Sequence, residues 1–371
     1  MNKVDFSKPR YDEIEVSVFG PGFGECILIH IGNGRWIIVD SCLNPATKEP
    51  SPSEYLDQLG IHTTDIDTIV VTHWHDDHVR GVSKLVEKYK NAKVIVSGAV
   101  KGDEFLRLLG FFHRETMIKS SSGVRELTKI IEITKRRRGS IKRAIAERLL
   151  VRVKLDDDGR KVHITSLSPS DEAILRSNFE VAKLIPEVKS EIRRIPSIRP
   201  NHTAVVLWVS INDINFLLGS DLECSTDQRM GWLNILESET KPEGKAVFFK
   251  IPHHGSESSH EQRVWDEMLH YSPIAVVTPF SKGNIKLPKV KDIDRICSLT
   301  DKGYITAENV EKRAKFRNRI DKIMKSTVKN RKVLFSSYGH VRCRLKTDKD
   351  KRQWKIDCLG KALKLESLLQ V

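Results

Sequence analysis

Runs of apolar and β-branched residues alternate along the chain with segments in which apolar residues recur at helical spacing. Short apolar runs predict strands, and apolar positions three and four residues apart predict helices. No internal repeat is visible, and 371 residues can bury one large core or two modest ones. We predict strands at 14–19, 26–31, 36–40, 67–71, 93–97, 150–154, 162–167, 204–209, 214–218, 247–251 and 274–278, with helical segments between many of them.

The segment 72–78 reads Thr-His-Trp-His-Asp-Asp-His. His73, His75, Asp77 and His78 place three imidazoles and a carboxylate within six positions. The segment lies between an apolar run predicted as a buried strand and the helical spacing of Val79–Tyr89. Side chains in a strand-to-helix loop can converge on a small volume, and zinc, manganese and iron all accept neutral imidazole and carboxylate ligands. The pattern therefore predicts a metal site, whereas the alternative is a polar loop with clustered histidines.

Segments on both sides of this motif resemble those of a known family. Asp40 ends the predicted strand that begins at Trp36, and Asp221 ends a second one that begins at Phe216. Three further segments carry the likeness: Gly22–Ile29, Asn201–Leu207 and Pro252–Ser256. In this order, the segments resemble the metallo-β-lactamase-fold hydrolases, and they are most similar to the hydrolase domain of bacterial DNA-uptake (competence) channel proteins. The likeness extends over about residues 14–288 and, more weakly, through a hairpin near 333–357.

This resemblance implies a fold of the α+β class, a four-layer αββα sandwich with the metals at one edge. We expect a single domain over residues 1–371, with a basic insertion at about 101–161 and a basic C-terminal extension at about 302–371. No stretch approaches 18 apolar residues, so we expect a version of the hydrolase that stands alone, without the membrane channel.

The resemblance further implies two divalent metal ions, zinc or manganese. His73 and His75 would bind one ion, and Asp77 and His78 would bind the other. Asp221 would lie between the two ions.

The remaining ligands are less regular. The family's middle histidine corresponds to Asn201 or His202, and we expect His202 to bind metal and Asn201 to lie behind the ligands. Asp40 is expected to accept a hydrogen bond from a ligand imidazole, as residues behind metal ligands usually do. The family's last ligand histidine is absent, because Leu287 or Pro279 stands at its two alternative positions. We therefore expect one metal ion to be bound more weakly.

Two adjacent histidines, His253 and His254, are expected to act with Asp77 in catalysis. In the family a histidine here is either a metal ligand or a proton donor to the leaving oxygen. Neighbouring side chains of an extended chain leave on opposite faces, although Gly255 permits a tight turn. We therefore predict that one histidine lies near the metals and that the other is hydrogen-bonded within its own loop.

The formal charge of +14 is distributed unevenly along the chain. Residues 135–161 carry 11 Lys or Arg against 4 Asp or Glu, and residues 302–371 carry 20 against 7, so the rest of the chain is net acidic. The first of these segments contains the adjacent cations Lys135, Arg136, Arg137 and Arg138. Basic charge concentrated in this way favours contact with nucleic acid over a merely solvated surface. The pattern does not indicate sequence-specific recognition, and it leaves room for a protein partner.

The six cysteines show no Cys-x-x-Cys spacing and no secretion signal precedes them, so we expect reduced thiols in the cytoplasm. Three functions compete. The motifs and charge favour a metal-dependent phosphodiesterase or nuclease that acts on DNA or RNA through a metal-activated water. A hydrolase of small esters, lactones, cyclic nucleotides or β-lactams is the alternative. A non-catalytic scaffold is disfavoured because it would not need the metal-type residues.

Overall fold

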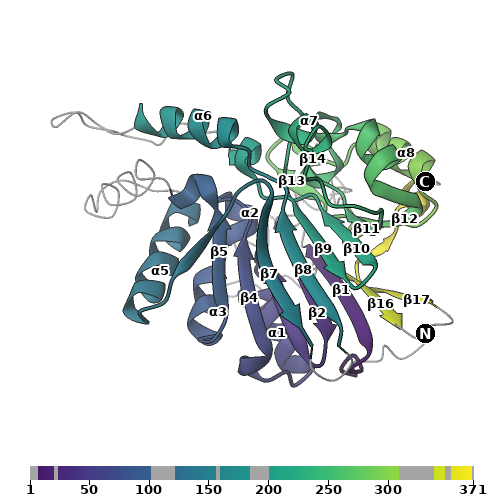
Figure 1. Cartoon of the computed structure of the whole chain (residues 1–371). Helices are drawn as coiled ribbons and strands as arrows, with labels where there is room; N and C mark the ends of the chain where they lie inside the picture. Colours follow the sequence, from purple (N-terminus) through teal and green to yellow (C-terminus); the bar gives the residue numbers. More distant parts are fainter. Residues whose placement is uncertain are drawn as a thin grey trace, which may run out of the picture.

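The structure is a computed structural model that describes residues 7–20, 24–101, 122–155, 159–183, 200–308, 338–346 and 352–369. Two large β-sheets face each other, and helices cover their outer faces (Figure 1). Each large sheet has eight strands, and a two-stranded hairpin stands beside them. The hairpin consists of β13 (Phe280–Lys282) and β14 (Ile285–Leu287).

The first sheet contains both predicted strands from the N-terminal half and a hairpin from the C-terminal segment. Its strands are β1 (Glu13–Gly20), β2 (Cys26–Gly32), β3 (Arg35–Val39), β4 (Ile66–Val71), β5 (Lys93–Ser97), β6 (Ile141–Ala144), β16 (Gly339–Lys346) and β17 (Trp354–Gly360). The order is β17-β16-β1-β2-β3-β4-β5-β6. Pairing is antiparallel from β17 to β3 and parallel from β3 to β6.

The second sheet repeats this division into an antiparallel half and a parallel half. Its strands are β7 (Arg148–Lys154), β8 (Lys161–Ser166), β9 (Leu207–Ile211), β10 (Ile214–Leu218), β11 (Ala246–Lys250), β12 (Leu269–Val277), β15 (Gly303–Ile305) and β18 (Leu363–Lys364). The order is β18-β15-β12-β11-β10-β9-β8-β7. Strands β7 to β10 are antiparallel, β10, β11, β12 and β15 are parallel, and β18 closes the edge in antiparallel pairing.

Three layers of apolar side chains hold the sandwich together. Val16 and Ile29 of the first sheet pack against Val209 and Phe216 of the second in the layer between the sheets. Because side chains alternate between the two faces of a strand, the intervening residues form the outer layers. Since helices cover those outer faces as well, central strands such as β2, β3 and β10 are buried on both sides, and this explains their nearly continuous apolar runs.

The first outer layer lies under α1 (Ser51–Gln58), α3 (Val82–Lys88) and α5 (Ser122–Arg136), whose Leu56, Leu85 and Leu127 pack on the first sheet. The second lies under α7 (Gly231–Leu236) and α8 (Val290–Leu299), where Trp232 and Ile293 pack on the other sheet. A further helix, α6 (Asp171–Ala182), follows β8. The predicted four-layer αββα sandwich is therefore confirmed. None of the described helices is long and apolar enough to cross a membrane.

Several elements differ from those expected. The helix expected at 79–89 is two helices, α2 (Asp76–Val79) and α3, because Gly81 adopts a left-handed φ of 85°. A side chain at this position would come within 3 Å of Leu43 and Pro50, so the close approach of the chain requires glycine. Strand β9 begins at Leu207 rather than at 204, because Val205 N and Val206 N donate to the Thr72 carbonyl and to Ser168 Oγ instead of pairing with a strand. The helical run expected at 104–112 lies outside the described residues.

The segments expected as basic additions contribute strands to both sheets. Within 101–161, β6 extends the first sheet and β7 lies at the edge of the second. Within 302–371, β15 and the hairpin of β16 and β17 belong to the sandwich, and the hairpin overlaps the one expected near 333–357. The basic residues in these strands therefore belong to the folded core structure and also contribute to the positive charge of the protein. Whether the remaining parts are separable additions stays a prediction.

We predict that Arg344→Met lowers the free energy of unfolding by about 3–5 kcal/mol, because it leaves a buried carboxylate without its cation. Arg344 Nε lies 2.7 Å from Glu15 Oε2, and both side chains are almost fully buried where β16 joins β1. Denaturant unfolding would measure the change. Arg352→Met is the matched control, since Arg352 forms an exposed ion pair with Asp213 that should contribute about 1 kcal/mol or less. Equal losses in the two variants would contradict the prediction.

Candidate metal centre

The predicted ligands gather where the parallel strands of both sheets end. The His73–His78 segment follows β4, and Asp40 follows its neighbour β3. Asp221 follows β10, and His253 and His254 follow the adjacent β11. The carboxyl ends of parallel neighbours lie at the same edge of a sheet, so residues far apart in the chain meet at one edge of the sandwich.

Asp221 lies at the centre of this cluster. Its carboxylate oxygens lie 3.3 Å from His78 Nε2, 3.6 Å from His254 Nε2 and 3.9 Å from His73 Nε2. Two groups of potential metal ligands share Asp221. The first consists of His73, His75 and Asp221, and the second of Glu25, His78, Asp221 and His254. Asp221 is therefore the residue that the two groups have in common, and a bridging role between two ions stays a prediction.

The three histidines that face Asp221 are each held from behind through Nδ1. His78 Nδ1 donates to Asp40 Oδ2 at 2.8 Å, and His254 Nδ1 donates to the Thr278 carbonyl at 3.1 Å. His73 Nδ1 lies 3.0 Å from Thr72 Oγ1. Since that hydroxyl donates its own proton to Asp40 at 2.6 Å, it accepts from His73. In a neutral ring whose Nδ1 donates, Nε2 carries the lone pair, and this is the tautomer that a metal ligand needs.

Several polar atoms at the centre lack a hydrogen bond. Among the described residues, His73 Nε2, His78 Nε2 and Asp221 Oδ1 are buried without a hydrogen-bond partner. Buried polar atoms are nearly always satisfied, so unsatisfied ones require an explanation such as an ion. Nitrogen and carboxylate oxygen donors at these positions suit zinc, manganese or iron. The residues therefore fit the divalent metals that the fold implies.

Electrostatics within the cluster favour ionised carboxylates. Burial alone raises the pKa of Asp221, but the charges of His78 and His254 outweigh it and hold this pKa well below its usual range. Burial also raises the pKa of Asp77, yet its hydrogen bond to His254 and the nearby charges leave this pKa lowered.

The imidazoles respond in opposite ways. Burial lowers the pKa of His78, but Asp221 and Glu25 more than compensate and raise it well above its usual value. The pKa of His254 is raised in the same manner, chiefly by Asp221. For His73 the effect of burial prevails, and its pKa is lowered well below the usual value. Without a metal, the carboxylates therefore favour protonated His78 and His254. A bound divalent cation would replace those protons.

Asp77, expected as a ligand of the second ion, lies at the edge of that group. Its Oδ2 is 3.3 Å from His254 Nε2 and 3.9 Å from His78 Nε2. Asp40 lies behind His78, where its geometry suits the supporting role that we predicted. His75 belongs to the first group, and its ring is more exposed than that of His73.

His202 does not join the two ligand groups of His, Cys, Asp and Glu found among the described residues. Asn201 and His202 both lie on the 3₁₀ turn Pro200–Thr203, and His202 Nδ1 is buried without a partner among those residues. The Asn201 amide lies 3.2 Å from Glu223 Oε1 and 3.2 Å from His253 Nε2. Asn201 therefore contacts His253 beside the ligand groups, and its supporting role and the ligand role of His202 both stay predictions.

The two adjacent histidines point to different places. His254 is buried beside Asp77 and Asp221, and its ring stacks on Phe280 with a centroid distance of 5.0 Å. The His253 side chain is 19% exposed and lies 3.1 Å from Glu223 Oε1. His253 also contacts Ser258 within its own loop at 3.3 Å. This geometry matches the predicted division between the two histidines.

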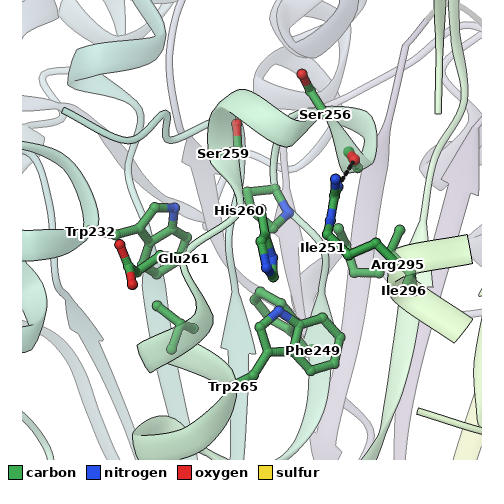
Figure 2. Close-up of a pocket in the computed structure, with 13 residues that line it drawn as sticks. Trp232, Phe249, Ile251, Ser256, Ser259, His260, Glu261, Trp265, Arg295 and Ile296 are labelled. Carbon is green, nitrogen blue, oxygen red and sulfur yellow. Dashed lines mark hydrogen bonds between the residues drawn. The ribbon is translucent and has the colours of Figure 1, made fainter. Parts of the chain in front are cut away.

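An unusual backbone makes the division possible. His253, His254 and Gly255 have φ values of 44°, 54° and 78°, so three consecutive residues are left-handed. Non-glycine residues rarely adopt this conformation, and such strain persists only when the surroundings impose it. Here His253 N donates to the Ser220 carbonyl at 2.9 Å, and Arg295 of α8 donates to the Gly255 carbonyl at 2.7 Å. Figure 2 shows this second contact beside an aromatic pocket formed by Trp232, Phe249 and Trp265.

Four further residues near the site were not predicted from the sequence: Glu25, Lys250, Glu223 and Thr278. Glu25 stands within the Gly22–Ile29 segment that carried part of the resemblance, and this was the available signal. Lys250 ends an apolar strand, a position that is usually exposed, although its side chain is fully buried here. Thr278 and Glu223 have no local pattern that distinguishes them from surface residues.

The basic stretch lies away from the cluster. Arg136 and Arg137 contact Glu87 of α3, at 2.7 Å and 3.8 Å, while Lys135 and Arg138 are exposed. The opposite end of α5 approaches the site, because Gly123 N donates to Asp76 Oδ1 at 2.7 Å. A helix of 15 residues is roughly 20 Å long, so a substrate that reached both places would have to be extended.

A family model described as the metallo-beta-lactamase superfamily matches residues 19–116, which include the His73–His78 segment. No curated protein matches the chain. Among solved structures, a metallo-beta-lactamase HARLDQ-motif mutant from Cronobacter sakazakii is 15% identical with a TM-score of 0.30. The metallo-beta-lactamase fold protein YhfI from Bacillus subtilis is 11% identical, also with a TM-score of 0.30.

The alignments cover 56% and 58% of this chain, and 61% and 65% of those two structures, so the chain spans less than two thirds of either. Likenesses this distant have no bearing on function. The family model and the two-sheet sandwich together show that the chain has the metallo-beta-lactamase fold, whose members are generally hydrolases.

We predict that His254→Ala greatly weakens metal binding, whereas His253→Ala leaves the metal content unchanged. The His254 ring faces Asp221, whereas His253 bonds to Glu223 outside the cluster. Elemental analysis after dialysis against a weak chelator would measure the bound metal in both variants, and circular dichroism would confirm that they are folded. Equal metal content in the two variants would show that the histidines do not differ in this way.

Proposed function

We propose that the protein is a metal-dependent hydrolase that cleaves phosphodiester bonds in nucleic acid. One observation carries the hydrolase assignment: the buried Asp221 carboxylate faces the Nε2 atoms of three imidazoles whose Nδ1 atoms are all anchored. Such anchoring orients ligands before any metal arrives, and it has no evident purpose in a scaffold. The specific likeness to the hydrolase domain of DNA-uptake channels is part of this proposal.

The residues divide into those that would hold metal and those that would handle the substrate. His73, His75 and Asp221 would hold one ion, and His78, His254 and Asp221, with Asp77 beside them, would hold the other. A pair of such ions supplies a water nucleophile at neutral pH and stabilises charge on the attacking and leaving oxygens. Thr72, Asp40 and Thr278 keep the ligand rings in position.

His253 is suited to proton transfer beside the ligand groups. It is partly exposed, and Glu223 and Asn201 fix its ring through contacts of 3.1 Å and 3.2 Å. If the leaving oxygen took the place of Asn201 at Nε2, a proton on that nitrogen would pass to it, a contribution of about 10²- to 10⁴-fold in rate. This role follows from its position beside the ligand groups rather than within them.

A polyanionic substrate is supported by charge. The chain carries a net charge of +14, and the stretch 135–138 presents exposed cations at the end of α5 and just beyond it. Hydrolysis of a small ester, lactone, cyclic nucleotide or β-lactam by the same centre is the alternative. Salt distinguishes the two, because polyanion binding weakens steeply with salt concentration, whereas turnover of a small neutral ester does not.

We predict that His73→Ala and Asp77→Ala each reduce metal-dependent hydrolysis to a few per cent or less of the parent rate. Cleavage of single- and double-stranded DNA and RNA would be measured with Zn²⁺ and Mn²⁺, beside a chromogenic β-lactam and a phosphodiester dye. Since both side chains are buried, thermal unfolding must show that the variants are folded. Hydrolysis of only the small substrates would support the alternative function, and unchanged rates would refute the site.

The basic stretch should contribute to affinity without contributing to the metal centre. We predict that Lys135→Ala with Arg138→Ala weakens DNA binding and reduces the slope of log K against log salt by about 0.9 for each lost phosphate contact. Arg136 and Arg137 are left in place because they pair with Glu87. Lys93→Ala with Lys245→Ala removes the same charge from two other exposed sites. Equal slopes in the two double variants would show that 135–138 is only a solvated surface.

A further inference from the structure

Lys250 is a fully buried lysine beside the candidate metal centre. It is the last residue of β11, which lies between β10 and β12 in the second sheet. Its Nζ donates to the Ile251 carbonyl at 2.9 Å and to Glu25 Oε2 at 2.8 Å. Burying an ammonium group costs several kcal/mol unless it is well paired, and an apolar residue in its place is often as stable. The buried ammonium group of Lys250 therefore points to a role other than stability.

The partner of Lys250 belongs to the other sheet. Glu25 directly precedes β2, and its carboxylate is 2% exposed. Thr278, which follows β12, donates its hydroxyl to the same Oε2 atom. The Glu25 backbone is also fixed, since its N–H donates to the Asp77 carbonyl at 2.9 Å. Lys250 and Glu25 thus form an ion pair across the sandwich at the edge that carries the cluster.

Glu25 approaches two ligand histidines from behind. Although it lies within reach of the second ligand group, its oxygens are nearest to ring nitrogens that do not face Asp221. They lie 3.9 Å from His78 Nδ1 and 3.8 Å from His254 Nδ1. Both Nδ1 atoms already donate, to Asp40 and to Thr278. Glu25 is therefore a residue that supports the ligands rather than a ligand itself.

We propose that Lys250 is a positioning residue of the metal centre, which holds Glu25 and Thr278 in place behind His78 and His254. His78 follows a strand of the first sheet and His254 a strand of the second, so their spacing depends on how the two sheets meet. The ion pair between Glu25, beside the first sheet, and Lys250, in the second, holds the two sheets together at this edge. The inference rests on the proposed metal-dependent function.

Metal affinity tests this role directly. Lys250→Met keeps the length and apolar stem of the side chain and removes the ammonium group. Loss of a residue that supports metal ligands typically weakens metal affinity by roughly 10- to 100-fold. We expect such a loss in the dissociation constant for Zn²⁺, measured by competition with a chromophoric chelator. Lys245→Met, an exposed lysine just before the same strand, should bind Zn²⁺ like the parent.

A double variant separates positioning from stability. Glu25→Gln with Lys250→Met removes both charges, so no buried charge is left unpaired. We expect the metal-free double variant to unfold at nearly the parent temperature and yet to bind Zn²⁺ roughly 10- to 100-fold more weakly. If Lys250→Met alone does not fold, the double variant still tests whether Lys250 positions the metal ligands. Parent-like Zn²⁺ affinity in the double variant would overturn the proposal, because the pair would then be structural only.

The same measurements keep this proposal apart from the proposed function. A parent protein that binds Zn²⁺ but cleaves no nucleic acid contradicts only the substrate, and the comparison of affinities remains decisive for Lys250. A parent protein that binds neither Zn²⁺ nor Mn²⁺ overturns both proposals.

Discussion

The carboxylate of Asp221 lies where water does not reach it, between 3.3 and 3.9 Å from the Nε2 atoms of three histidines. Charges and lone pairs cannot remain together in such a place without compensation, because burial penalises each of them separately. A shared cation is the simplest compensation. The surrounding polar residues can be understood as the means of keeping these four groups aimed at one small volume. Thr72, Asp40 and Thr278 each accept a hydrogen bond from the Nδ1 atom of one histidine, so that Nε2 of that ring faces Asp221.

Both sheets are needed to build this centre. Each changes from antiparallel to parallel pairing near its middle, and the parallel strands of both end at the same edge. The first sheet supplies His73 and His78, and the second supplies Asp221 and His254. Any relative shift of the sheets would change the ligand spacing. The apolar layer between them and the buried pair of Lys250 and Glu25 therefore bear on the chemistry as well as on stability.

The loop after β11 shows how local strain and function are connected. Left-handed backbone at both His253 and His254 would not persist in an isolated peptide. Contacts to the Ser220 carbonyl and from Arg295 hold it in the folded protein. As a result, two neighbouring side chains reach two different environments, one inside the ligand cluster and one partly exposed beside it.

The apolar runs of the sequence determined most of the strands, and its spacing determined the proximity of His73, His75 and His78, which are close together in the chain. The sandwich and the place of Asp221 were implied by the family resemblance, because Asp221 lies far from the histidine motif in the chain. The sequence could not determine which of His253 and His254 turns inward, since that depends on contacts with Ser220 and with α8. Glu25 and Thr278 were missed because they meet only when the two sheets pack, 253 residues apart in the chain. The break at Gly81 likewise depends on Leu43 and Pro50 lying against it. Tertiary structure decided these features because each arises from the packing of distant segments, which leaves no periodic pattern in the sequence.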